Sequence, residues 1–446
     1  MAQISIVQYS DIKDSLRFDA DFFKPEYIEI EKKVSLYDFL GDISYITDGI
    51  HESIDFNNES EILLFSAKAP KENYFDISGL KCIASEQHNK NPRTALREND
   101  VIISTVGTVG NCAVVTSDLL PANSDRHVGI IRMQNISPFF ISTFLLSKYG
   151  RKQTSRFQVG NVQPNLYIRD LKKIKIPILS KEFQLKIERS IKSAHKKQTQ
   201  SKQLYKESEE LLLKELGLLD YTPKLQLTFE ANKKEVEESA RFDSEYFQPK
   251  YKEIIAKIES YSNGFDFVNN QFRQNKKLSK KDKDFYSYIE ISDVNISNGE
   301  IIPSKINIKN IPANGKIKLF KNDLLISKVR PYRGAISFID FEKENLLGSG
   351  AFTVLQEKAE YKKEVLMIFL KTVFIKELLL RYNCGTSYPV IKDEDILNLK
   401  IPLIKPQIQK QIAAKVQESH KLRKESKDLL EEAKRKVEEE IEKAAS

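Results

Sequence analysis

The feature that most constrains this chain is an internal repeat. The segment RFDADFFKPEY at residues 17–27 returns as RFDSEYFQPKY at residues 241–251, with six of eleven positions identical. Two further positions, Asp21/Glu245 and Phe22/Tyr246, are conservative pairs. A match of this length, more than half the chain apart, indicates a duplicated segment.

Two further matches extend the repeat along the chain. LRENDVIISTVGTVGNCAVV at 96–115 corresponds to LFKNDLLISKVRPYRGAISF at 319–338. GNVQPNLYIRDLKKIKIPI at 160–178 corresponds to GTSYPVIKDEDILNLKIPL at 385–403. The offsets of the three matches are 224, 223 and 225 residues, so hardly an insertion separates the halves. The chain is therefore predicted to be a tandem duplication of one fold, with a period too long for a solenoid repeat.

Most of each half reads as a mixed α+β lobe. Short β-branched and aromatic runs, punctuated by Asn, Asp, Gly and Pro, predict strands within residues 61–67, 101–106, 127–133, 286–292 and 323–329. Pro25 and Pro249 suit the first turn of a helix, and the aromatic residues before them are expected to pack that helix onto its lobe.

A long helix is predicted after each lobe. Residues 181–217 and 405–443 contain no proline except Pro406 at a helix start and no glycine except the terminal Gly217. Apolar and small residues follow a spacing of three and four along both segments, and the two sets coincide at an offset of 225. This seam comprises Ile187, Ile191, Ala194, Ser201, Tyr205, Leu212, Ile412, Val416, Ser419, Ser426, Leu430 and Val437.

The seam favours a coiled coil of the two helices, because its 3.5-residue repeat lasts four heptads and its Ala and Ser residues allow close approach. The alternative is two independent amphipathic helices, each on its own lobe; a seam this rich in serine buries little apolar area for that purpose. Antiparallel pairing would place the lobes at opposite ends of a rod, related by an approximate two-fold axis. About 36 residues at ~1.5 Å each give a rod of roughly 54 Å, about the axial length of 16 base pairs of DNA.

The domain organisation follows from these boundaries. We expect a first lobe at 1–180, a central helix at 181–218, a second lobe at 219–403 and a C-terminal helix at 404–446. No apolar run approaches the ~20 residues of a membrane span, and the N-terminus lacks the layout of a secretion signal, so a cytoplasmic location is expected. The cysteines and histidines show no CxxC or HxxxH spacing, and no metal site is predicted.

In the order of its motifs, repeated twice, the chain resembles the specificity subunit of type I restriction-modification systems. The motifs are the RFD…F…P.Y segment, the ND(v/l)(i/l)IS strand, the G…P…K-I-P segment and the glutamine-containing helix starts. The resemblance implies two target-recognition domains joined by two coiled-coil helices. It implies a subunit that is not an enzyme and binds double-stranded DNA, with one half of a bipartite site read per lobe.

The resemblance also implies the partners. Two adenine methyltransferase subunits would be held by the chain and would recruit the restriction and translocase subunits. No cofactor is expected on this chain, and S-adenosylmethionine and ATP would bind only to partner subunits. The absence of an amide-binding methyltransferase motif, a glycine-rich nucleotide loop and a Walker sequence agrees with a non-catalytic role.

Basic residues interleaved with amides on predicted loops are candidates for DNA contact, since Arg and Lys bind phosphates or guanine edges and Gln and Asn pair with adenine. In the first lobe they are Lys68, Lys71, Lys90, Arg93, Arg151, Lys152, Arg156, Gln158, Asn161 and Gln163. In the second lobe they are Arg273, Lys276, Lys277, Lys280, Lys281, Lys328, Arg330 and Arg333.

Two alternatives stay open at this point. The net charge of +8 is a modest excess for 446 residues, so the same lysines could simply keep the lobes in solution. The chain could also be a two-headed scaffold that binds proteins through its helices and has no DNA specificity. Salt-dependent retention on DNA would distinguish the two functions.

Overall fold

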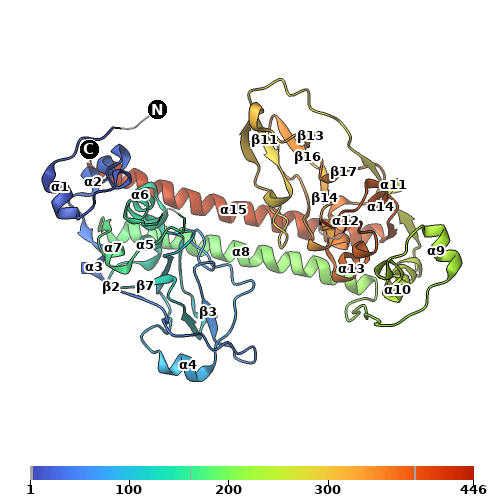
Figure 1. Ribbon diagram of the computed structural model, residues 1–446, viewed down its shortest axis with the longest axis horizontal. Helices are drawn as coiled ribbons and strands as arrows, with labels where there is room; N and C mark the ends of the chain where they lie inside the picture. Colours follow the sequence, from blue (N-terminus) through green and yellow to red (C-terminus); the bar gives the residue numbers. More distant parts are fainter. Residues whose placement is uncertain (1–3, 161, 386–387, 446) are drawn as a thin grey trace. The chain divides into compact units, whose positions relative to one another are not determined.

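The computed structural model describes residues 4–160, 162–385 and 388–445 (Figure 1). The chain divides into two compact units. Unit 1 holds the chain up to Lys197 and again from Lys424, and unit 2 runs from Gln198 to Arg423. Each unit therefore contains a mixed α/β lobe together with part of each long helix, α8 (Lys181–Glu215) and α15 (Pro406–Ala445).

Unit 1 is built around an antiparallel sheet of order β2-β7-β4-β5, beside a parallel pair β3-β6 and a short pair β1-β8. The strands are β1 Asp38–Phe39, β2 Ser44–Asp48, β3 Leu63–Phe65, β4 Val101–Ser104, β5 Cys112–Val114, β6 Ala122–Ser124, β7 Val128–Met133 and β8 Lys175–Ile176. The helices are α1 Tyr9–Ser15, α2 Pro25–Val34, α3 Leu40–Ile43, α4 Ser85–Lys90, α5 Pro138–Leu146, α6 Lys148–Phe157 and α7 Ile168–Leu171.

Strand β4 shows why its run of apolar residues is continuous. Successive side chains of a strand point to opposite faces, and both faces of β4 are covered. Val101 and Ile103 belong to a core with Phe140 of α5, whereas Ile102 joins a second core with Phe65 of β3. A strand buried on both sides needs no alternation of polar and apolar residues.

Unit 2 repeats this sheet in the order β10-β17-β14-β15, and its second sheet has four strands, β12-β11-β16-β13. The strands are β9 Phe265–Phe267, β10 Phe272–Gln274, β11 Phe285–Ile289, β12 Ser304–Asn307, β13 Gly315–Lys318, β14 Leu324–Ser327, β15 Ile336–Phe338, β16 Leu346–Ser349, β17 Phe352–Glu357 and β18 Lys400–Pro402. The helices are α9 Lys233–Ser239, α10 Pro249–Glu259, α11 Val268–Gln271, α12 Lys363–Lys371, α13 Val373–Arg381 and α14 Asp393–Leu397.

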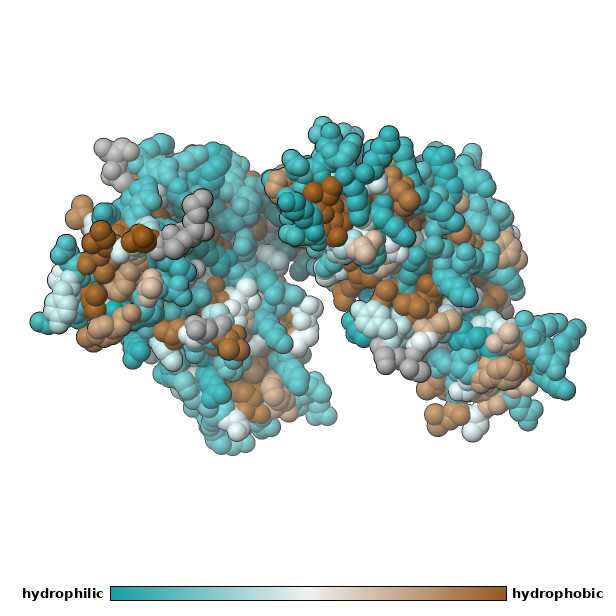
Figure 2. Space-filling model, turned by 45° about the horizontal axis from the view of Figure 1, so that its top comes forward, coloured by the Kyte–Doolittle hydropathy of each residue, from teal (hydrophilic) through white to brown (hydrophobic). Residues whose placement is uncertain are grey.

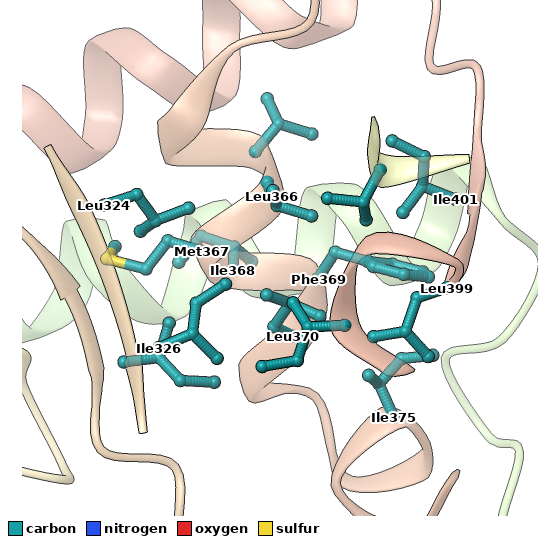
Figure 3. Packing of buried hydrophobic residues seen from close by; sticks show 14 of the residues in the cluster. Leu324, Ile326, Leu366, Met367, Ile368, Phe369, Leu370, Ile375, Leu399 and Ile401 are labelled. Atoms are coloured by element: carbon teal, nitrogen blue, oxygen red, sulfur yellow. The ribbon is translucent and has the colours of Figure 1, made fainter. Parts of the chain in front are cut away.

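The core of unit 2 lies between β14 and α12 (Figure 3). Leu324 and Ile326 of β14 share it with Leu366 and Phe369 of α12. Leu325, which points to the other face of β14, belongs to a separate core with β11 and β17. Each of the five segments that the sequence predicts to contain a strand does contain a strand.

The two RFD segments, residues 17–27 and 241–251, have the same local structure. Helices α2 and α10 begin at Pro25 and Pro249, as expected. A 3-10 turn precedes each helix, and Asp19 caps the first turn by accepting the Phe22 N–H at 3.0 Å. Phe22 and Phe247 are buried, which confirms that aromatic residues fasten each segment. Phe18 and Phe242 depart from the expectation, because both side chains project into solvent.

Within unit 1, α8 and α15 lie against each other. Ile187, Ile191 and Ala194 share a core with Leu430 and Val437. The Ser426 hydroxyl donates to the Ala194 carbonyl at 2.8 Å, and Lys197 pairs with Glu425. Residues later in α8 contact residues earlier in α15, so the two segments run antiparallel.

The same holds within unit 2 for the remaining parts of these helices. The Ser201 hydroxyl donates to the Ser419 carbonyl and the Ser419 hydroxyl to the Ser201 carbonyl, both at 2.7 Å. Leu212, Ile412 and Val416 are buried in the unit 2 core, with Tyr205 packed against it. Side chains this small let the two backbones come close enough for hydroxyls to reach across.

Candidate nucleic-acid interface

In each unit, one pair of loops meets beside the sheet β2-β7-β4-β5 or its counterpart. In unit 1 the turn after β4 forms two backbone hydrogen bonds with the loop before α7. The Leu166 N–H donates to the Thr105 carbonyl at 2.8 Å, and the Gly107 N–H donates to the Pro164 carbonyl at 3.3 Å. In unit 2 the equivalent bonds are Ile391 N–H to Lys328 O at 3.0 Å and Arg330 N–H to Pro389 O at 2.9 Å.

These loops border an open hollow of about 780 Å³ in unit 1. Its lining is largely polar and also contains the apolar residues Val106, Leu166 and Ile168. The lining residues include Asp48, His51, Thr105, Arg126, His127, Gln163, Asn165, Tyr167 and Arg169. Arg126, Gln163 and Arg169 are exposed, so their side chains are available to a molecule that enters the hollow.

Asp48 orders one wall of the hollow. Its carboxylate pairs with the His51 ring at 2.7 Å and the Arg93 guanidinium at 3.2 Å, and Arg93 also bonds the Thr47 hydroxyl. Burial acts to raise the pKa of Asp48, but the hydrogen bonds from His51 and Arg93 outweigh it and hold that pKa below its usual value. Asp48 therefore stays ionised and keeps Arg93 in place beside the hollow.

The other walls present cations and a stacking surface. His127 pairs with Asp125 at 3.3 Å, and the Arg169 guanidinium lies 5.1 Å from the centre of the Tyr167 ring. Among the residues that the structure describes, Arg126 has no carboxylate partner. An exposed, unpaired guanidinium in an open hollow is suited to a phosphate or a base edge.

The equivalent loops of unit 2 also carry cations. Lys328 pairs with Asp393 at 3.2 Å, and the Arg330 guanidinium lies 5.0 Å from the centre of the exposed Tyr388 ring. Arg330 adopts a left-handed backbone with φ of 47°, a conformation that a residue with a side chain adopts at a cost of roughly 1–2 kcal/mol. Arg333 follows in the same turn and is exposed.

A second basic surface lies on the sheet that unit 2 alone enlarges. The loop after β10 presents Lys276, Lys277 and Lys280 to solvent, and the Lys277 ammonium lies 5.4 Å from the centre of the Phe320 ring. Lys281 is half-buried, and the Arg273 side chain donates to Gln356 at 3.1 Å. Backbone bonds to β13 hold this loop, including Lys318 N–H to Lys277 O at 2.8 Å.

Several basic residues of unit 1 that the sequence suggested as DNA contacts lie away from the hollow. On α6, Arg151 pairs with Glu72 at 3.3 Å and Lys152 pairs with Glu26. Arg156 is buried, where it donates to the Phe22 carbonyl at 3.0 Å and pairs with Glu31 at 2.6 Å. These three contacts hold parts of unit 1 together.

The remaining suggested residues of unit 1 are spread over three places. Lys68 and Lys71 lie on the loop 66–76, which contacts α5 through Asn73. Lys90 ends α4 and pairs with Glu86 at 2.7 Å. Gln158 is half-buried at the end of α6, whereas Gln163 lines the hollow. Asn161 lies outside the described residues.

Of the polar residues that line the hollow, the sequence suggested only Gln163. It missed the two arginines and two histidines, Arg126, Arg169, His51 and His127, as well as Asp48, Thr105 and Asn165. It also missed the lysines of the enlarged sheet, Lys305, Lys316 and Lys318, which are exposed on β12 and β13. The position of Arg126 and His127 in a short turn before β7 was the available signal, but nothing local links this turn to residues 163–169.

No helix in the described ranges is both long enough and apolar enough to cross a membrane. Within the same ranges, no group of three or more His, Cys, Asp and Glu side chains is placed to hold a metal ion.

Comparison with known families identifies the second half of the chain. Residues 241–434 match the family described as type I restriction modification DNA specificity domain. The match begins at the second RFD segment and ends within α15, so it includes the basic loops of unit 2. These residues are therefore similar to the DNA specificity domain of type I restriction-modification systems.

Three solved structures align with most of the chain, each at 15% identity. The crystal structure of a type I restriction-modification system S subunit from M. genitalium covers 90% of this chain and 94% of its own, with a TM-score of 0.47. The HsdS subunit from Thermoanaerobacter tengcongensis covers 92% and 95%, with a TM-score of 0.27. The third structure comes from work on the structural basis of complex assembly and conformational transition of the type I R-M system. The alignment covers 92% of this chain and 97% of that chain, with a TM-score of 0.30. No curated protein matches the chain in sequence.

Proposed function

We propose that the chain is the DNA-recognition subunit of a type I restriction-modification complex and that each unit reads one half of a bipartite site. The observation that carries the proposal is the pair of loops that meets at the same place in both units, with cations and amides at the surface. The similarity of residues 241–434 to a type I restriction modification DNA specificity domain supports the class of function. The two units then supply two separate reading surfaces.

The residues that would contact DNA follow from exposure. In unit 1 we propose Arg93, Arg126, Gln163 and Arg169 at or beside the hollow, with the exposed Lys68 and Lys90 as phosphate contacts elsewhere on the unit. In unit 2 we propose Lys328, Arg330 and Arg333 on the shared loops and the lysines of the loop after β10. Amides and guanidinium groups beside the hollow would read base edges, and the outlying lysines would fix the register on the phosphates.

The long helices would set the spacer between the half-sites and dock two adenine methyltransferase subunits. Their antiparallel contacts within each unit support this role. Under the proposal the domains are lobes at 1–180 and 219–403 and helices at 181–218 and 404–446. The chain itself would be non-catalytic, and methyl transfer and cleavage would belong to its partners.

The test is a lobe exchange in the full chain. Replacing residues 222–402 with the corresponding lobe of another specificity subunit is expected to change one half-site and leave the other intact. Selection of bound sites from random DNA by the parent and the exchanged chain measures this directly. A simultaneous change of both half-sites would contradict independent reading by two units. Retention on DNA that does not fall with salt would point instead to a protein scaffold.

A further inference from the structure

The RFD segments hold one aromatic side chain outside each unit. Phe18 is 86% exposed and Phe242 is 88% exposed, at the same position of the two segments. Their neighbours Phe22 and Phe247 are buried. An exposed phenylalanine is unremarkable alone, but two at equivalent positions of a duplicated segment indicate a retained use.

The surrounding contacts fix each ring outside. Arg17 and Asp19, on either side of Phe18, pair at 2.6 Å, and the Arg17 guanidinium lies 4.8 Å from the centre of the Phe22 ring. With both neighbours bound to the unit, Phe18 is directed to solvent.

Unit 2 reproduces this arrangement in detail. Arg241 and Asp243 pair at 2.6 Å, and Arg241 also donates to the Asn383 carbonyl at 2.9 Å. The Arg241 guanidinium lies 4.9 Å from the centre of the Tyr246 ring. The hydrogen bond from the arginine lowers the pKa of Asp19 and likewise that of Asp243, so both pairs are ionised over the neutral range.

The residue before each segment adds a second common feature. Leu16 has φ of 53° and Ala240 has φ of 48°, both left-handed. Neither is glycine, so this backbone is disfavoured and is kept in both copies at a conformational cost. Helices α1 and α9 end at these residues, and Val236 of α9 lines the same hollow as Phe242.

Further apolar surface surrounds each ring. In unit 1, Tyr9 and Leu16 are 79% and 78% exposed. In unit 2, Phe242 borders a hollow of about 410 Å³, whose lining includes Leu227, Phe229, Val236 and Phe247. Figure 2 shows apolar surface over the part of unit 1 that contains α1 and over the part of unit 2 that contains α9 and α10. Exposed apolar patches with polar rims mark sites of protein contact.

The charge around the rings argues against DNA. Residues 7–27 contain five acidic and three basic side chains, and residues 231–251 contain five acidic and four basic ones, in a chain whose net charge is +8. Asp19 and Asp21 are exposed beside Phe18, and Asp243 and Glu245 beside Phe242. These four carboxylates are paired with Arg17, Lys24, Arg241 and Lys250. The remaining excess of acidic over basic side chains makes both segments a poor match for phosphates and for the same surface of a second copy of this chain.

We propose that Phe18 and Phe242 anchor two equivalent docking surfaces for one kind of protein partner, bound once per unit. The matching partner surface is an apolar pocket that accepts the ring, with basic side chains at its rim. The proposal rests on the proposed function, in which the partner present in two copies is the methyltransferase subunit. It deepens that function by placing the contact on the RFD segments in addition to the long helices.

The test compares four full-length chains, namely the parent, Phe18→Ala, Phe242→Ala and the double variant. Each is mixed with the adenine methyltransferase subunit of a type I restriction-modification system from the same source, and the mass of the complex and the affinity are measured by light scattering and calorimetry. A buried aromatic anchor dominates an interface, so each single variant is expected to keep one tightly bound copy and to lose the other by about thirtyfold or more. The double variant is expected to weaken both.

Two controls separate the possible outcomes. Leu36→Ala removes a side chain that is 95% exposed elsewhere on unit 1, and it is expected to bind two copies like the parent. Site selection from random DNA by each isolated chain should give the same sequence, because the rings do not face DNA.

If the double variant bound two methyltransferase subunits with parental affinity, the proposed docking surfaces would be wrong and the proposed function would be unaffected. Failure of the parent chain to select any sequence would instead count against the proposed function. Self-association of the parent that the double variant loses would overturn the proposed partner in favour of a second copy.

Discussion

The two units share one sheet and differ in the other. The sheet β2-β7-β4-β5 of unit 1 and the sheet β10-β17-β14-β15 of unit 2 have the same strand order. Beside them, unit 1 has the two parallel strands β3 and β6, whereas unit 2 adds β12 and β13 to the equivalent parallel pair β11 and β16. The added strands carry Lys305, Lys316 and Lys318.

This difference separates the structural frame that both units share from the surface that would read DNA under the proposed function. The shared sheet is fixed by buried apolar residues and tolerates little change in volume. In the second sheet the shared parallel pair is also buried, whereas the added strands β12 and β13 are largely exposed, so a unit can gain strands and charges there without disturbing the core. Unit 1 concentrates its polar groups in one hollow, and unit 2 spreads lysines over a larger face.

The largest expected effect comes from reversing the charge of the lysine face. Lys276→Glu, Lys277→Glu and Lys280→Glu together should weaken the binding of all DNA sequences by about a hundredfold or more. Removing three phosphate contacts should also lower the slope of log affinity against log salt by roughly 2.7, at ~0.9 per contact. Titration of the full chain with specific and nonspecific DNA between low and physiological salt measures both effects.

A matched control and a matched variant in unit 1 sharpen the comparison. Lys202→Glu, Lys206→Glu and Lys421→Glu reverse three exposed lysines on the long helices within unit 2 and should leave the salt slope nearly unchanged if DNA does not contact them. In unit 1, Gln163→Ala should cost roughly 1–3 kcal/mol at one base pair of the specific site, with no change in slope. A lysine variant with the parental slope would assign those lysines to solubility.

The second prediction concerns a buried aspartate that both units keep in different surroundings. Asn99 and Asn322 adopt left-handed backbones with φ of 72° and 73°. The next residue of each pair, Asp100 or Asp323, accepts the backbone N–H three residues earlier at 2.9 Å. Asp100 also binds the Arg132 guanidinium at 3.1 Å, whereas Asp323 binds the amides of Asn275 and Gln356 at 2.9 and 2.6 Å.

Asp100→Asn should therefore destabilise unit 1 more than Asp323→Asn destabilises unit 2. The first leaves the largely buried Arg132 without its carboxylate, at a cost of about 3 kcal/mol, and the second exchanges one hydrogen-bonding group for another, at about 1 kcal/mol. Hydrogen exchange of the β4 and β14 amides reports the stability of each unit separately. Equal losses of stability in the two units would mean that the ion pair with Arg132 contributes no stability beyond the other hydrogen bonds of Asp100.

The pH dependence of unfolding free energy tests the two buried aspartates, Asp100 and Asp323, independently. Burial raises the pKa of Asp100 and the pKa of Asp323 above the usual value. The folded chain then binds these protons more readily than the unfolded chain. Each carboxyl therefore lowers stability as the pH rises from its usual pKa through its raised pKa. Asp323→Asn should remove this decline for unit 2 between the usual and the raised pKa of the carboxyl.

These residues also show what the sequence could and could not predict. The Asn-Asp pairs, the helix starts at Pro25 and Pro249 and the long helices depend on neighbours within a few residues, and periodicity with turn chemistry finds them. The hollow of unit 1 joins Asp48, Arg126 and Gln163, which are separated by more than thirty residues each. Arg156 was suggested as a DNA contact from its basic, glutamine-rich surroundings, yet its burial depends on Phe22 and Glu31, more than a hundred residues away.

The smallest expected effect compares the helix seam of the two units. At an offset of 225, Ala194 of unit 1 corresponds to Ser419 of unit 2, and Ser426 corresponds to Ser201. Unit 1 thus has one hydroxyl across the seam, from Ser426 to the Ala194 carbonyl, and unit 2 has a reciprocal pair. Ser419→Ala would give unit 2 the arrangement that unit 1 already has.

Ser419→Ala should therefore cost less than about 1 kcal/mol of unfolding free energy. The lost hydrogen bond contributes roughly 1 kcal/mol, and the higher helix propensity of alanine returns about half of that. Ser419→Leu is the contrasting variant, because extra methylene groups between closely packed helices should cost roughly 1–3 kcal/mol through overpacking. Urea unfolding and hydrogen exchange of the α15 amides measure both. If Ser419→Ala cost as much as Ser419→Leu, the reciprocal hydroxyl pair would be holding the helices together in unit 2, and the seams of the two units would differ in kind. If only the leucine variant is destabilised, small size is what both seams require.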